Sequence, residues 1–185
     1  MSTWTLDAAH SQIEFSVKHM MITTVRGQFR QFTVDVDFDE EHPEASSVVA
    51  HVDASSIETG MEARDVHLKG ADFLAADQYP ELTFRSTGIA ADGDGYKIDG
   101  DLTIHGQTHP VKLEAEIGGV VPNMQGGRRA AFNATTKISR KAFGLSWNVA
   151  LESGGFLVGD EIKISIDLAV LQAEGAGRVA ASTAA

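Results

Sequence analysis

The chain has 185 residues, 43% of them hydrophobic, and its 26 acidic and 15 basic residues give a formal net charge of −11 at pH 7. This length suits one domain with a sizeable core, while the negative charge argues against nucleic acid and anionic membrane surfaces as partners. The absence of cysteine excludes disulfide bonds, thiolate metal sites and cysteine nucleophiles.

The N-terminal residues, MSTWTLDAAHSQ, lack the basic start and the apolar run of about 7–15 residues that a signal peptide requires. Nowhere do about 18 apolar residues occur together, which is the length of a membrane-spanning helix. If Met1 is the native start, we therefore expect a cytoplasmic protein without membrane insertion.

Alternating apolar and polar residues run through most of the chain, which is the pattern of half-buried antiparallel strands. The alternation covers nine stretches, from which about eight strands are expected: residues 4–6, 13–19, 32–38, 48–52, 82–84, 98–104, 111–117, 132–138 and 162–170.

Turn signals separate these strands. Residues 92–95 (DGDG) and 105–108 (HGQT) predict hairpin turns, and the glycine pairs at 118–119 and 126–127 are expected to bracket a loop. Residues 19–27 break the alternation, so one turn of helix is expected there. Residues 139–155 have no regular pattern.

The stretch from residue 57 to residue 84 is where the chain stops alternating. Thr59 and Glu62 have the spacing of a capping box, and Gly70 stands where a helix would end, so a helix of two to three turns is expected between them. Pro80 then forces Tyr79 into extended geometry and begins the next strand.

Strands with one apolar face and short connections satisfy either a sandwich or a closed barrel. We favour an all-β, eight-stranded antiparallel up-and-down barrel with short helices near its mouth, because sequential hairpins close naturally and leave no exposed edge. Residues 1–170 are expected to form this single domain, and residues 171–185 a disordered tail.

Small residues at mid-strand bear on whether the barrel is hollow. Ala50, Gly100, Ala115 and Ala134 lie on four different predicted strands and contribute almost no volume. They would leave a space for one small ligand, or they would accommodate the taper of a packed barrel.

The residues that could carry catalysis are poorly placed for it. His105 and His109 flank a turn, and no histidine pair lies on a predicted helix with a carboxylate ligand nearby, so no metal site is expected. Neither a nucleophile elbow nor a phosphate-binding glycine loop occurs. His67 is expected to form a solvated cluster with Asp72 or Glu62. We expect no catalytic residue and no catalytic cofactor.

Five segments together resemble the YceI-like family: residues 10–29 (HSQIEFSVKHMMITTVRGQF), 55–87, 100–113 (GDLTIHGQTHPVKL), 143–148 (FGLSWN) and 158–167 (VGDEIKISID). They occur in the family's order across nearly the whole folded chain. The resemblance implies a lipocalin-like barrel of eight antiparallel strands, with helical segments near its mouth and a long apolar pore for a polyisoprenoid. Family members with signal peptides are periplasmic, and this sequence lacks that signal.

The resemblance implies non-catalytic binding, transport or storage of an isoprenoid lipid, either a polyprenyl chain or a prenylated quinone. Because such a chain forms no hydrogen bonds, its affinity must come from buried apolar area, at about 25 cal/mol per Å². Strand phase assigns the pocket wall to Phe15, Val17, Phe32, Val34, Val36, Phe84, Leu102, Ile104, Leu113, Phe132, Ala134, Ile164 and Ile166. Residues expected to cover or extend the pocket are Met20, Met21, Leu68, Phe73, Phe143 and Trp147, and those expected to contact a headgroup at its mouth are Arg64 and His67.

Two other functions stay open at this point. An enzyme acting on a hydrophobic substrate would use His19 or His67 as a general base. A stress-response barrel would instead have a filled interior. The oligomeric state is also open, with a homodimer among the options.

Overall fold

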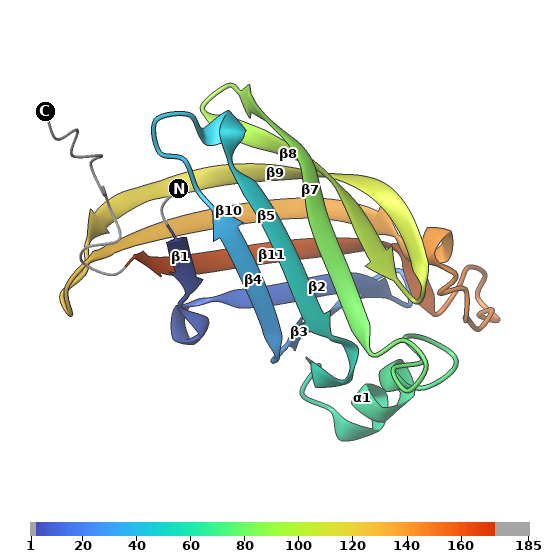
Figure 1. The fold of residues 1–185 in the computed structure, drawn as a ribbon. Coiled ribbons are helices and arrows are strands. Elements are labelled where there is room, and N and C mark those ends of the chain that lie inside the picture. Colours follow the sequence, from blue (N-terminus) through green and yellow to red (C-terminus); the bar gives the residue numbers. More distant parts are fainter. Residues whose placement is uncertain (1–2, 173–185) are drawn as a thin grey trace, which may run out of the picture.

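The computed structural model describes residues 3–172, which form one antiparallel β-sheet rolled into a barrel, with short helices at its margins (Figure 1). The strands are β1 (Thr3–Leu6), β2 (Gln12–His19), β3 (Thr23–Phe29), β4 (Phe32–Asp37), β5 (Ser47–Asp53), β6 (Ile57–Glu58), β7 (Glu81–Asp92), β8 (Gly95–Ile104), β9 (Gln107–Pro122), β10 (Arg128–Ser139) and β11 (Val158–Gln172). The helices are α1 (Glu62–Lys69) and the short 3₁₀ helices η1 (Ala8–His10), η2 (Pro43–Ala45), η3 (Ala54–Ser56) and η4 (Arg140–Phe143).

Eight of the strands close into a ring, because β1 pairs with β4 on one side and with β11 on the other. The ring runs β1-β4-β5-β7-β8-β9-β10-β11 and returns to β1, with every pairing antiparallel. Most neighbours in it are strands that follow one another along the chain. The predicted eight-stranded barrel is confirmed.

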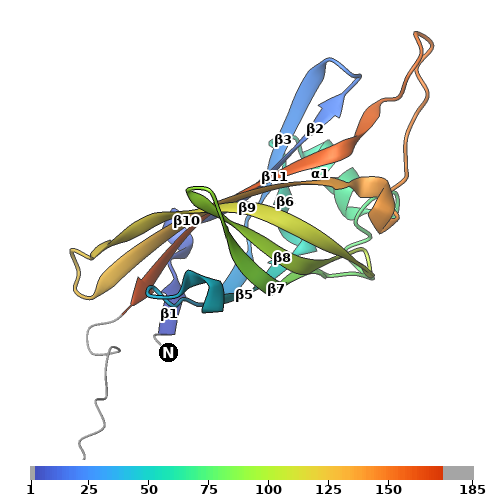
Figure 2. The same cartoon turned by 90° about the horizontal axis from the view of Figure 1, so that it is seen from above.

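The other strands extend the sheet beyond the ring. β1 and β2 lie one after the other along the same edge of β11, where Leu6 pairs with Val170 and Ile13 pairs with Ile166. β3 then adds to β2, and the short β6 adds to β3. In Figure 2, β2 and β3 project beyond the rest of the sheet on the side where α1 lies.

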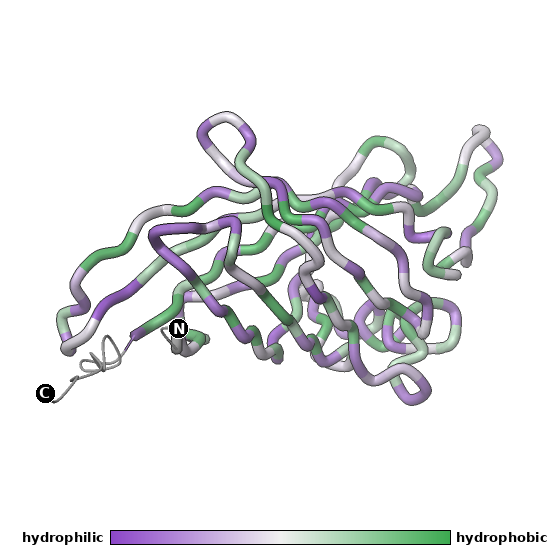
Figure 3. Tube along the Cα trace, turned by 45° about the horizontal axis from the view of Figure 1, so that its top comes forward, coloured by the Kyte–Doolittle hydropathy of each residue, from purple (hydrophilic) through white to green (hydrophobic). Residues whose placement is uncertain are grey.

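The alternation of side chains separates an apolar interior from a polar surface, as the changing colours along the strands in Figure 3 show. On β10, Phe132 and Ala134 line the interior. Lys137, an odd number of positions away, lies on the outer surface, with its Nζ atom 3.1 Å from Glu161 Oε1 on β11. The period of two in the sequence therefore predicts which face of each strand is buried.

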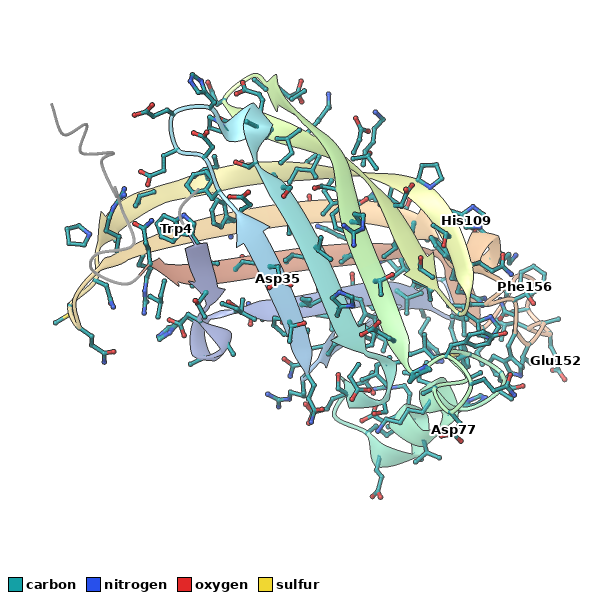
Figure 4. The ribbon with its side chains drawn as sticks, in the orientation of Figure 1. Trp4, Asp35, Asp77, His109, Glu152 and Phe156 are labelled. Atoms are coloured by element: carbon teal, nitrogen blue, oxygen red, sulfur yellow. The ribbon has the colours of Figure 1, made fainter. Side chains whose placement is uncertain are left out.

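Two clusters of buried side chains close the barrel at opposite ends, and Figure 4 shows Trp4 at one of them and Phe156 at the other. At the first end, Trp4 packs with Phe38 at a ring-centroid distance of 6.0 Å, and Phe38 meets Phe132 edge-on at 5.0 Å. Ala130 and Val170, both fully buried, complete this cluster. We call this the Trp4 end.

The opposite end, which we call the helix end, consists mainly of irregular chain. It comprises α1, residues 70–80 and residues 140–157, which include η4. Its packed apolar cluster comes mainly from strand termini and these irregular segments, and its buried members are Ala54, Ile57, Leu74, Ala76, Ile104, Ile138 and Phe143.

A buried arginine holds the irregular chain of the helix end in place. Arg140 is 2% exposed, and its guanidinium donates hydrogen bonds to four backbone carbonyls. The acceptors are Gly159 at 2.8 Å, Trp147 at 2.9 Å, Val158 at 3.2 Å and Leu145. Because buried carbonyl groups need donors, one side chain here replaces the ladder of bonds that a strand would supply.

The start of α1 differs from the prediction. The helix begins at Glu62, with Met61 as its N-cap and no side-chain capping bond. Thr59 instead donates its N–H and its hydroxyl to Asp65 Oδ1, at 2.8 and 2.5 Å. The predicted capping box is wrong because a carboxylate inside the helix reaches back to the preceding chain. The predicted end at Gly70 is confirmed.

Two further local predictions are wrong. Residues 19–27 form no helical turn, because β2 and β3 join in a tight hairpin where Met20 and Met21 have φ angles of 51° and 66°. Asn and Gly are the usual residues at such positions, so the two methionines gave no turn signal. Gly118 and Gly119 lie within β9, where the register against β10 shifts, and the loop is limited to residues 123–127.

The hairpin turns predicted at residues 92–95 and 105–108 are confirmed. β7 is longer than the predicted 82–84. β11 continues to Gln172, two residues past the predicted end of the domain. The remainder of the predicted tail, residues 173–185, lies outside the described residues.

Candidate ligand-binding cavities

Two cavities lie end to end inside the barrel. The one nearer the Trp4 end has a volume of about 130 Å³, and the one nearer the helix end about 190 Å³. We call them the Trp4-side and helix-side cavities. Both have almost wholly apolar walls, and the residues that line both of them are Ile13, Ala50, Phe84, Leu113 and Ile166. The cavities therefore adjoin at a shared wall.

Three of the predicted small residues explain why the interior is not filled. Ala50, Ala115 and Ala134 all line the Trp4-side cavity. Ala134 pairs directly with Ala115 across β10 and β9, so two methyl groups lie side by side where larger side chains would meet. A packed core leaves few voids larger than a water molecule, so this volume is a departure from ordinary packing.

The fourth small residue, Gly100, has a different role. A Cβ atom at Gly100 would lie 2.4 Å from two ring carbons of Phe84, so that ring sits directly against the glycine backbone. Gly27 accommodates the ring of Phe15 in the same way, again at 2.4 Å. Both glycines let a large ring lie along the wall of the barrel and leave the interior open.

Fourteen of the predicted pocket residues line one or both cavities. They are Phe15, Val17, Val34, Val36, Leu68, Phe73, Phe84, Leu102, Ile104, Leu113, Phe132, Ala134, Ile164 and Ile166. The other seven, namely Met20, Met21, Phe32, Arg64, His67, Phe143 and Trp147, are not part of either lining.

Arg64 is held by the chain just before α1. Its Nε atom donates to the Thr59 hydroxyl at 2.6 Å, and one terminal nitrogen donates to the Thr59 carbonyl at 2.9 Å. Two bonds to one residue fix the guanidinium outside the cavities. In this structure Arg64 therefore stabilises the entry to α1.

His67 supports the cavity wall from behind. Its Nε2 atom lies 2.9 Å from Asp72 Oδ2, so of the two predicted partners the structure has Asp72. The imidazole meets Phe73 and Trp147 edge-on, at centroid distances of 5.0 and 4.7 Å. Phe73 lines the helix-side cavity, so His67 and Trp147 hold that ring in position.

The other predicted residues lie outside the cavity linings for different reasons. Met20 and Met21 lie at the exposed β2–β3 turn. Phe143 is 2% exposed and belongs to the packed cluster of the helix end, where it meets His109 edge-on at 5.0 Å. Phe32 lies at the first position of β4, away from the lined part of that strand.

The cavities also have wall residues that the sequence reasoning missed. Ile98, Ile117 and Leu168 stand in phase with predicted residues on their own strands, so the alternation could have identified them. Leu74 and Leu145 come from irregular chain at the helix end and have no periodic signal.

Two charged side chains of the helix end, Arg140 and Asp160, influence each other's pKa, and Arg140 lines the helix-side cavity. Burial lowers the pKa of Arg140, and the Asp160 carboxylate opposes this, yet an arginine stays protonated throughout the physiological range. Burial alone would raise the pKa of Asp160, but hydrogen bonds from the Ser139 hydroxyl and the Lys141 N–H, with the charges of Lys141 and Arg140, outweigh it and lower the pKa.

A polar cleft of about 450 Å³ adjoins the Trp4-side cavity from outside. The residues that line both are Phe38, Pro43, Tyr96 and Ile117. The cleft also carries Glu40 and Asp94, and Glu40 is ion-paired with Arg128 on β10.

Neither His19 nor His67, the candidates for a general base, lines a cavity. Within residues 3–172, no group of three or more His, Asp or Glu side chains is arranged to hold a metal ion. Across the same range, no helix has both the length and the apolar character needed to span a membrane.

Comparison with known proteins gives a consistent result. The model of the YceI-like domain matches residues 4–170. The UPF0312 protein SA2479 of Staphylococcus aureus strain N315 is 38% identical over 164 residues, which are 88% of this chain and 94% of the relative.

Solved structures share the barrel. The crystal structure of Burkholderia cenocepacia BcnA superposes with a TM-score of 0.75 at 28% identity, covering 89% of this chain and 98% of BcnA. A polyisoprenoid binding domain from Saccharophagus degradans superposes with a TM-score of 0.64, covering 93% of this chain and 99% of that domain. Its identity is 13%, so that likeness concerns the fold alone.

Proposed function

This chain belongs to the YceI-like family, and we propose on that premise that it binds one long isoprenoid chain inside its barrel without catalysing a reaction. The two adjoining apolar cavities carry this proposal. The ligand is a polyprenyl chain or the tail of a prenylated quinone, and the protein carries or stores it.

The shape of the interior supports a long and narrow ligand. Along β11, the walls of the two cavities extend from Val158 to Leu168, which corresponds to roughly 30 Å at about 3.3 Å per residue. A compact ligand would fill one cavity, whereas an extended chain would occupy both and pass the shared wall at Phe84.

The chemistry of the walls supports an apolar ligand. A cavity without polar partners stays dry, so a ligand entering it displaces little ordered water. Affinity then follows from the apolar area removed from water, at about 25 cal/mol per Å². The polyisoprenoid binding domain with the same fold offers a precedent for this class of ligand.

The direct experiment is to extract the purified protein with organic solvent and to analyse the extract by mass spectrometry. We expect an isoprenoid lipid, and we expect the emptied protein to take up added polyprenyl compounds. An empty extract combined with no uptake would remove the proposal.

Ala134→Phe tests whether the hollow is the binding site. In a filled core such an enlargement costs about 1–3 kcal/mol, but here the ring can enter the Trp4-side cavity. We therefore expect the free energy of unfolding to change by less than about 1 kcal/mol, and long-chain ligands to lose binding while short ones keep it.

Ala90→Phe is the matched control, because Ala90 is exposed on β7. It should bind long and short ligands as the wild type does. Strong destabilisation by Ala134→Phe would indicate a packed interior, and unchanged long-chain binding would place the ligand elsewhere.

A further inference from the structure

The helix end carries an unusual group of exposed apolar side chains. They lie on the β2–β3 turn and on residues 149–156, and they are Met20, Met21, Ile22, Val149 and Phe156. We call this group the apolar tip. Ile22 is 81% exposed and Phe156 55% exposed. Large apolar residues clustered on projecting loops mark an interaction surface more often than isolated ones do.

The two loops form one continuous surface. The Met20 N–H donates to the Leu157 carbonyl at 2.8 Å. The Met21 side chain covers Gly155, where a Cβ atom would lie 2.4 Å from the methionine sulfur. Figure 2 shows that the β2–β3 hairpin and the loop before β11 project from the barrel on the same side.

The charge around the apolar tip is opposite in sign to that of the whole chain. Residues 16–26 contain Lys18 and Arg26 and no acidic residue, while residues 141–160 contain Lys141, Glu152 and Asp160. The two segments therefore have three basic residues against two acidic, in a chain whose formal charge is −11. The Lys141 ammonium lies 5.7 Å from the centroid of the Phe156 ring, so a cation accompanies the most prominent ring of the tip.

The basic residues stand where they could meet a surface that the tip touches. Lys18 is paired with Thr24 across the hairpin, and Ser16 with Arg26. Because side chains two positions apart share a face of a strand, Lys18 and Arg26 lie on the same face. Both are exposed.

We propose that the apolar tip docks on an anionic lipid surface, where the barrel takes up or releases its ligand. The proposal rests on the isoprenoid-binding function and specifies where the ligand is exchanged. Aromatic and aliphatic side chains would enter the interfacial layer, while the neighbouring lysines and arginine attract anionic headgroups.

The path from the tip to the interior is short. Val17, three positions before Met20, lines the helix-side cavity, and so does Val158, which directly follows Leu157. The negative net charge does not prevent docking, because charges at the distant Trp4 end, such as Asp94 in the polar cleft, are screened beyond about 8–10 Å.

The charge pattern favours a lipid surface over a second copy of the chain. A two-fold contact places the same patch on both subunits, so the basic residues around one tip would face those around the other. Such like-charge contacts disfavour a homodimer through this surface.

Vesicle sedimentation tests the docking. Wild-type protein should bind vesicles of phosphatidylglycerol and phosphatidylcholine in equal parts, should bind pure phosphatidylcholine weakly, and should be released by salt. Ile22→Ser with Phe156→Ser should weaken binding by about tenfold, and Lys18→Glu with Arg26→Glu should do so independently. Val121→Ser with Met124→Ser is the control, because both are exposed apolar side chains, Val121 near the end of β9 and Met124 in the turn before β10.

A second measurement separates this inference from the proposed function. All of these variants should bind a polyprenyl compound delivered from detergent as the wild type does, but the two tip variants should take it up from anionic vesicles about tenfold more slowly. If the wild-type protein does not bind the polyprenyl compound delivered from detergent, the proposed function itself is refuted.

Equal vesicle binding by the tip variants and the control would overturn the docking proposal while leaving ligand binding intact. A wild-type dimer that the Ile22→Ser and Phe156→Ser changes convert to a monomer, as measured by light scattering, would assign the tip to self-association and would also overturn the proposal.

Discussion

The two ends of the barrel are closed by different means. At the Trp4 end, β1 pairs with both β4 and β11, and interlocked aromatic rings fill the space behind these strands. At the helix end, irregular chain covers the opening. It is held by four hydrogen bonds from the Arg140 guanidinium, by the Asn148 side chain and by scattered backbone bonds.

This difference indicates which end can open. Paired strands lose a ladder of backbone bonds when they separate, so they open only with much of the fold. Irregular segments can move as a smaller unit with a lower free energy of opening. We therefore expect ligand to pass through the helix end, next to the apolar tip, while the Trp4 end stays shut.

Trp4→Ala should have the largest effect on stability, because it removes the centre of the Trp4-end cluster. Trp4 is 4% exposed, and replacing a buried aromatic residue with alanine costs about 3–5 kcal/mol. Urea denaturation should show this loss. The amide exchange rates of residues 141–158, relative to those of the barrel strands, should change little. Phe156→Ala, at an exposed aromatic residue of the other end, should cost less than about 0.5 kcal/mol.

Arg140→Leu should weaken the helix end selectively. The change removes four hydrogen bonds to backbone carbonyls, of which the Val158 carbonyl keeps a second donor, the Asn148 amide at 2.7 Å. We expect a loss of about 3 kcal/mol in the free energy of unfolding. Amide exchange should accelerate most across residues 141–158, and ligand release should become faster.

The matched control for Arg140→Leu is Arg85→Leu, because Arg85 is exposed on β7. It should change neither stability nor release. If Arg140→Leu speeds exchange evenly over the whole barrel, the helix end does not open as a separate unit.

Asp160→Asn should make the helix end less dependent on pH. The folded-state pKa of Asp160 lies below its ordinary value of 3.8, so the ionised carboxylate stabilises the fold above that value and loses this effect as pH falls through the folded pKa. At pH 7 we expect the variant to be less stable by about 1 kcal/mol. The difference should shrink on acidification below about pH 4, and a growing difference would contradict the assignment.

Asp72→Asn should have the smallest effect. The side chains of His67 and Asp72 are 42% and 52% exposed, and exposed pairs of this kind contribute at most about 0.5–1 kcal/mol. We expect a change below about 0.5 kcal/mol in thermal or urea denaturation. A larger loss would mean that the aromatic contacts of His67 with Phe73 and Trp147 depend on the carboxylate.

The same contrast between the ends explains what the sequence could predict. Strand alternation repeats every two residues, so Val34, Phe84 and Ile166 could be assigned to the interior before any coordinates were known. The helix end has no such period. The acceptors of Arg140 lie 5 to 19 positions away along irregular chain.

Local signals failed where the backbone departed from the usual residue preferences. The β2–β3 turn has positive φ angles at Met20 and Met21, where glycine or asparagine is usual, so no residue type in this segment predicts the turn. At α1 the capping interaction runs from Thr59 to Asp65 in the reverse of the expected direction. The closing pair of the barrel joins opposite ends of the chain, a relation that no short window of sequence contains.

That closing pair has a consequence for how the protein is made. Thr5 and Leu6 pair with Leu171 and Val170, so the ring cannot form until nearly the whole described chain has left the ribosome. Until then the apolar faces of the earlier strands lack their final neighbours, and such long-range pairing is slow to form. The nascent chain is therefore prone to aggregation until β11 has been synthesised and pairs with β1 and β2.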